Sequence, residues 1–305
     1  MFEPAYRTGT TLTSPATVHY QCTGTTHTDP DVRPFHDIRW SVDYGDSACS
    51  SGQGSWENSP SGAPKNTETS PVGGHIYECA GTFTINITGC DSTGVCDSTN
   101  SGPLTIEAEN TGWTAANTRC VSGSGNWTGC PTGVTDLVTS YDYDTSLLTG
   151  AGKRTLFYYG DTFQASTDIT TSDASASNSL IGSYGTPGSR TTVQLVTSGM
   201  RLHSPLSNPD GMRVSGWRAR DIVYDATSVA GQEYVFNVWD GAAGGTDKLN
   251  VQLLRVDTLG VYACPTMGNP GTSSDWNHRI SIVGNHCTST SPNGTLFPGA
   301  TEASV

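Results

Sequence analysis

The fold of this chain is decided by DKLNVQLLRVD at residues 247–257 and by two segments built on the same plan, GMRVSGWRARDIVYD at 211–225 and HRISIVGNHC at 278–287. Each alternates polar and apolar residues, reaches a short bend, and becomes apolar again. The three recur roughly every 30–35 residues, which is typical of a repeat in which each coil covers the apolar face of the next. Shorter apolar runs precede them at 155–159, 179–185 and 192–196.

This pattern of recurring apolar strands and bends resembles that of right-handed parallel β-helices of the pectate-lyase type. The segment KRTLFYYGDTF at residues 153–163 resembles the opening strand and corner of such helices. The resemblance implies a solenoid over residues 153–305, with loops of variable length projecting from its turns. A second β-sandwich over the same residues is the alternative, because short strands separated by turns are also typical of sandwiches.

Residues 1–108 show period-2 alternation, which predicts strands with one buried face. In the run at 81–88, Phe83, Ile85 and Ile87 point to one side, and the turn at 91–94 predicts a hairpin with the next strand. The expected strands are 16–22, 38–44, 81–88 and 102–108, and residues 47–74 have the Gly, Ser and Pro content of a long loop.

Two motifs in this region resemble those of PKD domains. WSVDYGD at 40–46 resembles their W-x-F-G-D signature, and HIY at 75–77 followed by AGTFTI at 80–85 resembles their H-x-Y…G-x-Y-x-V segment. The resemblance implies an immunoglobulin-like β-sandwich. In such a sandwich Trp40 would fill the core, and Gly45 would permit the tight turn after its strand.

The sequence therefore predicts an all-β protein in three parts. These are a PKD-like, Ig-like β-sandwich (1–108), a disulfide-stapled linker or cap (109–152) and the coils of a parallel β-helix (153–305). Asp43 and Asp46, which flank Gly45, are expected to bond turn amides rather than to perform chemistry. The N-terminal residues lack the features of a signal peptide and no closing cap is recognisable after the last coil, so we expect the natural polypeptide to be longer.

The composition limits the classes of partner. The net charge is −13, and only three of the 15 basic residues are Lys. Nucleic acid is disfavoured as a partner, because phosphate binding needs clustered Lys and Arg. No run approaches the roughly 20 apolar residues of a membrane span. No motif requires a cofactor, and Ca²⁺ is the ion that an Asp-rich surface would suit.

Nine cysteines favour disulfides and hence an oxidising compartment, outside the cell or on its surface. Spacing suggests three pairs, Cys90–Cys96, Cys120–Cys130 and Cys264–Cys287. The remaining Cys22, Cys49 and Cys79 can form one pair at most. Reduced cysteines are the main alternative, because no paired Cys/His spacing typical of zinc sites occurs. A virion is the alternative location.

Two sets of residues are candidates for function. Asp225 and Asp257 could approach each other if their coils stack in register, and glycoside hydrolysis needs two carboxyl groups about 5–10 Å apart. Arg255 could serve as the base of a polysaccharide lyase. The alternative is that these aspartates cap turns. Trp127, Trp217 and Trp276 could stack on sugar rings, or could belong to the core.

The chain has few recognisable catalytic motifs and a modular β architecture. These features favour an extracellular structural or adhesive protein of a surface layer or fibre, which self-associates or contacts a polysaccharide. Two alternatives stay open. One is a carbohydrate-active β-helix enzyme, either a polysaccharide lyase or a glycoside hydrolase. The other is a phage tail spike or fibre. Fold-level analogy does not separate them, because β-helices carry many functions.

Overall fold

The computed structural model divides the chain into two compact units, Met1–Gly112 and Trp113–Ser304. Nearly all regular structure is β. Among the described residues, helix is confined to α1 (Glu109–Gly112) and the 3₁₀ turn η2 (Ala115–Asn117). The structure describes residues 2–4, 11–22, 32–33, 37–46, 67–69, 71–148, 152–169, 179–186, 189–200, 202–203, 217–229, 235–239, 248–261, 266–268 and 277–289.

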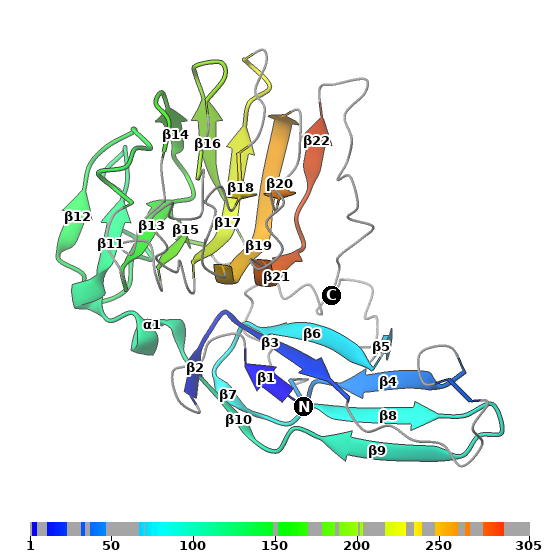
Figure 1. The fold of residues 1–305 in the computed structure, drawn as a ribbon. Coiled ribbons are helices and arrows are strands. Elements are labelled where there is room, and N and C mark those ends of the chain that lie inside the picture. Colours follow the sequence, from blue (N-terminus) through cyan, green and yellow to red (C-terminus); the bar gives the residue numbers. More distant parts are fainter. Residues whose placement is uncertain are drawn as a thin grey trace. The chain divides into compact units, whose positions relative to one another are not determined.

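The first unit holds three small sheets around one apolar core, with strand orders β1-β3-β6, β2-β10-β7 and β5-β4-β8-β9 (Figure 1). Most neighbours are antiparallel, but β2 and β10 run parallel. The strands are β1 (Phe2–Pro4), β2 (Thr11–Thr13), β3 (Ala16–Gln21), β4 (Arg39–Asp43), β5 (Thr67–Thr69), β6 (Val72–Tyr77), β7 (Gly81–Phe83), β8 (Asn86–Cys90), β9 (Cys96–Asn100) and β10 (Leu104–Glu107).

Strand β4 shows the predicted alternation, with Trp40 and Val42 buried in the core and their neighbours exposed. After it, the Asp43 carboxylate accepts a hydrogen bond from the Gly45 amide at 2.8 Å, as expected of a turn aspartate. Gly45 has φ +73°, and a Cβ there would lie 2.8 Å from the carbonyl oxygen of Thr84, so a side chain has no room.

The segment predicted as one strand at 81–88 is two strands in different sheets. Phe83, Ile85 and Ile87 are all buried, which confirms their common side. However, β7 pairs with β10, whereas β8 pairs with β4. The chain therefore crosses between sheets near Ile85 while its buried face stays continuous, and alternation alone does not reveal such a crossing.

The second unit is built on a ten-stranded sheet whose described pairings are all parallel. A separate parallel pair joins β18 and β20. The strands are β11 (Thr118–Val121), β12 (Asp136–Val138), β13 (Arg154–Tyr158), β14 (Thr162–Ala165), β15 (Leu180–Tyr184), β16 (Thr191–Leu195), β17 (Arg218–Asp225), β18 (Asn237–Trp239), β19 (Lys248–Val261), β20 (Thr266–Gly268), β21 (Asn277–Val283) and β22 (Cys287–Ser289).

The pairing falls into two rows joined at a bend. One row runs β12, β11, β13, β15, the first halves of β17 and β19, and β21. The other runs β14, β16, the second halves of β17 and β19, and β22. The bend predicted within the repeats lies at Asp221, Arg255 and Gly284, which are level with one another and have φ of 59°, 53° and 64°.

The interior of this unit is apolar and contains side chains from both rows, among them Val121, Phe157, Ile181, Ile222 and Val256. Most of the predicted linker belongs to this unit as well. Strand β11 pairs with both β12 and β13, so residues from Trp113 onward belong to the second unit and extend its sheet. The physical reason is that the apolar residues of β11 cover the next strand of the same row.

Candidate functional site

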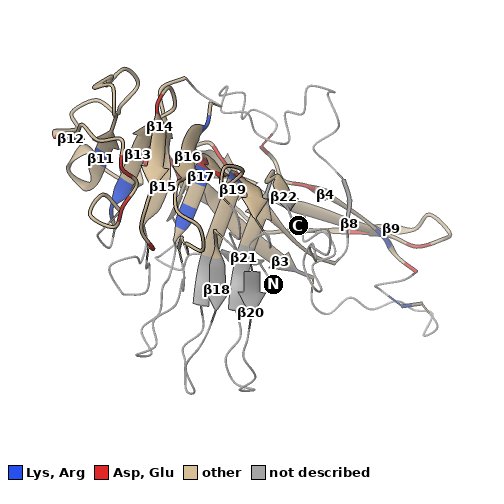
Figure 2. Cartoon of the chain, turned by 90° about the horizontal axis from the view of Figure 1, so that it is seen from above, with Lys and Arg blue, Asp and Glu red and all other residues tan. Residues whose placement is uncertain are grey.

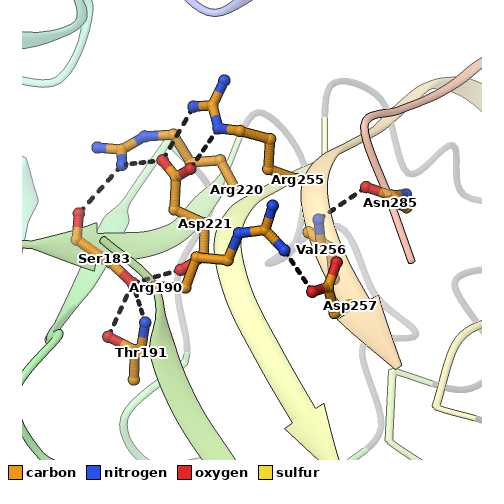
Figure 3. Close-up of polar contacts among 9 residues, drawn as sticks. All are labelled: Ser183, Arg190, Thr191, Arg220, Asp221, Arg255, Val256, Asp257 and Asn285. Atoms are coloured by element: carbon orange, nitrogen blue, oxygen red, sulfur yellow. Dashed lines mark hydrogen bonds and ion pairs between the residues drawn. The ribbon is translucent and has the colours of Figure 1, made fainter. Parts of the chain in front are cut away.

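A group of charged side chains lies at the bend in the parallel sheet (Figure 3). The Asp221 carboxylate accepts hydrogen bonds from Nε and Nη2 of Arg255, at 2.6 and 3.1 Å. It also accepts one from Nη1 of Arg220 at 3.1 Å. Both members of the Asp221–Arg255 pair are buried. Because a buried charge is costly unless it is paired, this contact ties strand β17 to strand β19.

A second group lies beside it. The Asp257 carboxylate forms an ion pair with Arg190 and accepts a hydrogen bond from the His286 amide at 2.9 Å. The Asn285 side-chain oxygen accepts one from the Val256 amide at 2.7 Å. These contacts join residues 29 or more positions apart in the chain, so they too hold together segments of the sheet that are distant in sequence.

The carboxylates of Asp225 and Asp257 form separate sets of contacts. Asp225 accepts hydrogen bonds from the amide and hydroxyl of Thr227, at 2.9 and 2.6 Å, and so caps the turn after β17. The register places Asp257 level with Val223, two residues before Asp225. The two carboxylates therefore have different partners. Arg255 is bound to Asp221 and buried, so the proposed base does not face solvent.

The three candidate tryptophans have different environments. Trp217 is 1% exposed and packs beside His203 and Phe236 in the core, so its predicted contact with glycans is wrong. Period-2 parity could not reveal this, because Trp217 has the same parity in the sequence as the polar residues Arg213 and Ser215. Trp127 is half-buried and packs on Cys120, Leu156 and Tyr184. Trp276 lies outside the described residues.

Trp127 belongs to a loop that the disulfide Cys120–Cys130 closes against the sheet. The Asn126 side chain donates a hydrogen bond to the Tyr158 hydroxyl, and the Tyr184 hydroxyl donates to the Asn126 carbonyl, both at 2.7 Å. Tyr158 and Tyr184 are level on neighbouring strands, with ring centroids 5.6 Å apart. We call Trp127, Tyr158, Tyr159 and Tyr184 the aromatic face; all but the buried Tyr184 are partly exposed.

Asp161 closes one end of this loop. It accepts hydrogen bonds from the Ser122 hydroxyl at 2.7 Å and from the Ser124 amide at 3.2 Å. Burial raises the pKa of Asp161, but the hydrogen bonds from Ser122, Ser124 and the Gly123 amide outweigh burial and lower that pKa below its usual value. Asp161 is therefore an ionised anchor for the loop.

A buried polar cluster was not foreseen from the sequence. The Tyr143 hydroxyl lies 2.9 Å from Nε2 of His203 and 2.7 Å from the Tyr224 hydroxyl. All three residues are fully buried, and Nδ1 of His203 has no hydrogen-bond partner among the described residues. Burial lowers the pKa of His203 to about 3 and raises the pKa of Tyr224, so these groups are neutral. Nothing local in the sequence marks this cluster, because its members lie 21 to 81 residues apart.

Two predicted disulfides are confirmed, Cys90–Cys96 and Cys120–Cys130. Cys79 and Cys287 are also disulfide-bonded, and Cys22 is free. Cys49 and Cys264 lie outside the described residues. Within the described ranges, no three His, Cys, Asp or Glu side chains are grouped as a metal site would need. No helix described there has the length and apolar character needed to cross a membrane.

Comparisons of the chain with protein-family models, with curated proteins and with solved structures returned no match. The chain's function is therefore inferred from its own residues.

Proposed function

We propose that this chain is an extracellular, non-catalytic structural or adhesive protein, with a PKD-like sandwich followed by a right-handed parallel β-helix. The β-helix is supported by the two parallel rows, by the left-handed bend repeated at Asp221, Arg255 and Gly284, and by the third parallel pair β18–β20. From β13 onward, successive segments of chain thus add a strand to each row, whereas β12 pairs with the outer side of β11. Crossovers between parallel strands are right-handed in almost all proteins, which supports the handedness.

The PKD-like character of the first unit is supported by Trp40 in the core and by Gly45 in its turn. Behind them, the buried Asp46 carboxylate lies 3.0 Å from Nε2 of His75. The His75 ring stacks on Tyr44 with centroids 4.0 Å apart. The two motifs that carry the resemblance therefore pack against each other and serve to stabilise the unit.

The non-catalytic role is supported mainly by one observation: the candidate carboxylates of the second unit already form hydrogen bonds and ion pairs within the protein. Asp221 binds two arginines, Asp257 binds Arg190, and Asp225 caps a turn. A glycosidase needs one carboxyl group that is protonated and another that is free to attack or to activate water. Carboxylates whose oxygens already accept hydrogen bonds from arginine or from turn amides are positioned for structure rather than for attack on a sugar.

Glycan contact is proposed for the aromatic face. Aromatic rings held by packing and hydrogen bonds stack on sugars with little loss of side-chain entropy. The oxidising location is supported by the disulfides that join Cys90 to Cys96 and Cys120 to Cys130.

Electron microscopy of the purified chain tests the structural role. Filaments or an ordered lattice are expected. A discrete monomer that binds no polysaccharide would refute the proposal. New reducing ends or unsaturated uronate products in a polysaccharide screen would establish an enzyme instead, and a discrete trimer would favour a tail spike.

The glycan contact is tested separately with Trp127→Ala in a polysaccharide-binding assay. Val196→Ala is the matched control, because Val196 is an exposed apolar residue of the same unit outside the aromatic face. Binding should weaken about tenfold for the tryptophan variant only, the loss expected when a stacked aromatic ring is removed. Equal binding by both variants would exclude the aromatic face.

A further inference from the structure

A small hollow lies at the amino ends of β11 and β13, away from the aromatic face and from the bend. Its volume is about 60 Å³. A single water needs about 10–15 Å³ on this measure, so the hollow has room for a few waters or one small polar group, but not for a sugar ring. Its lining consists of Ala116, Asn117, Thr118, Arg119, Asp136, Lys153, Arg154 and Thr155.

The lining is basic in a chain that is strongly acidic. It contains three cations, Arg119, Lys153 and Arg154, and one carboxylate, Asp136, whereas the whole chain has a net charge of −13. The sheet register causes this gathering, because Thr118 is level with Arg154, and Arg119 is level with Asp136. The basic residues lie along neighbouring strands near β11 and β13 in Figure 2.

The three cations are held in different ways. Arg154 is 1% exposed and donates from Nε and Nη2 to the Thr118 hydroxyl, at 3.1 and 2.9 Å. Arg119 pairs with Asp136 at 3.0 Å and donates to the Ser146 carbonyl at 2.9 Å.

Lys153 is the cation whose charge is not balanced nearby. Its ammonium group donates to two neutral acceptors, the Ala116 carbonyl at 3.4 Å and the Asn117 side-chain oxygen at 3.1 Å. No carboxylate of the described residues forms an ion pair with it. These contacts hold the ammonium at the rim of the hollow, and an ammonium has three donors.

We propose that this hollow binds a small oxyanion, namely a carboxylate, sulfate or phosphate group. Lys153 and Arg119 bind it from the rim of the hollow. A charged group attracts an anion more strongly beside a low-dielectric wall than in open solvent. The volume fits one such group, either free or as a substituent of a polymer. The proposal does not depend on the structural role proposed above.

In the test, inorganic sulfate, dextran sulfate and uncharged dextran are each titrated into the full chain. Binding of the free ion is monitored by NMR chemical shifts of the protein, and binding of the polymers by calorimetry. Saturable binding of sulfate is expected. Lys153→Gln should weaken it about tenfold, the loss expected for one hydrogen bond to a charged group. Lys153→Arg, which keeps the charge, should stay within a few-fold of the unaltered chain. Raising the salt concentration should weaken binding in every case.

Arg33→Gln is the matched control. The Arg33 side chain is 70% exposed and belongs to the first unit, so this variant loses the same charge without changing the second unit. Binding of inorganic sulfate would identify the free ion as a sufficient ligand, whereas binding of dextran sulfate alone would identify a polymer-borne group. Equal losses in Lys153→Gln and Arg33→Gln, or no saturable binding of either anion, would overturn the proposal.

Discussion

The pair formed by Asp221 and Arg255 is expected to be the strongest single electrostatic contact between the described strands of the parallel sheet. We predict that Asp221→Asn destabilises the second unit by about 3–5 kcal/mol, the usual cost of removing one partner of a buried ion pair. Asparagine keeps the shape and tolerates the left-handed backbone at φ 59°, so the loss reports the charge rather than the backbone. The estimate follows from three hydrogen bonds that donate to this carboxylate, two from Arg255 and one from Arg220.

Urea unfolding followed by circular dichroism measures this loss. With a slope of about 2 kcal/mol/M, the midpoint should fall by about 2 M. Asp225→Asn is the control, because Asp225 caps an exposed turn, and its loss should cost about 1 kcal/mol. Combining Asp221→Asn with Arg255→Gln should give a coupling energy of at least about 1 kcal/mol. If Asp221→Asn costs no more than Asp225→Asn, or if the two changes are additive, the pair does not hold the coils together.

Three further outcomes are expected. Burial lowers the pKa of His203 from 6.5 to about 3, so the unfolded chain binds the proton at a higher pH than the folded chain does. The contribution of the neutral His203 to stability is therefore fully present above pH 6.5, and the free energy of unfolding falls below that pH by up to about 1.4 kcal/mol per pH unit. Urea midpoints measured against pH should show a smaller slope in His203→Gln. Gly260→Ala should lower the free energy of unfolding by more than about 2 kcal/mol, because φ is +74° and a Cβ would lie 2.8 Å from a backbone nitrogen. The control Gly94→Ala has φ +86° but open space around the Cβ, so it should lower that free energy by only about 1 kcal/mol. Thermal unfolding measures both losses. Replacing both Cys120 and Cys130 with Ser opens a loop with a sequence separation of 10 and should lower stability by about 3 kcal/mol, with a smaller loss if the loop stays packed when reduced.

Local features of the chain were predictable because they depend on near neighbours. The strand at 39–43, the turn at Gly45, the hairpin after Cys90 and the two short-range disulfides follow from alternation, glycine and spacing. The repeated bend was also visible as a break in the apolar pattern of the three repeats. The sequence did not reveal that Asp221 and Arg255 have a left-handed backbone at this bend. Residues other than glycine rarely adopt that conformation without a compensating contact.

By itself, the sequence determined that this protein is nearly all β, has disulfides at short spacing and contains similar segments that recur roughly every 30–35 residues. These properties are encoded in side-chain period, turn residues and composition, each of which acts over a few positions. Only the tertiary structure decided which charged groups meet. Asp221 binds Arg255, Asp257 binds Arg190, and Arg119 lies beside Lys153 and Arg154, because strands dozens of residues apart in the chain pair in one register. A shift of one residue would turn each of these side chains to the other face, and no local pattern specifies that register.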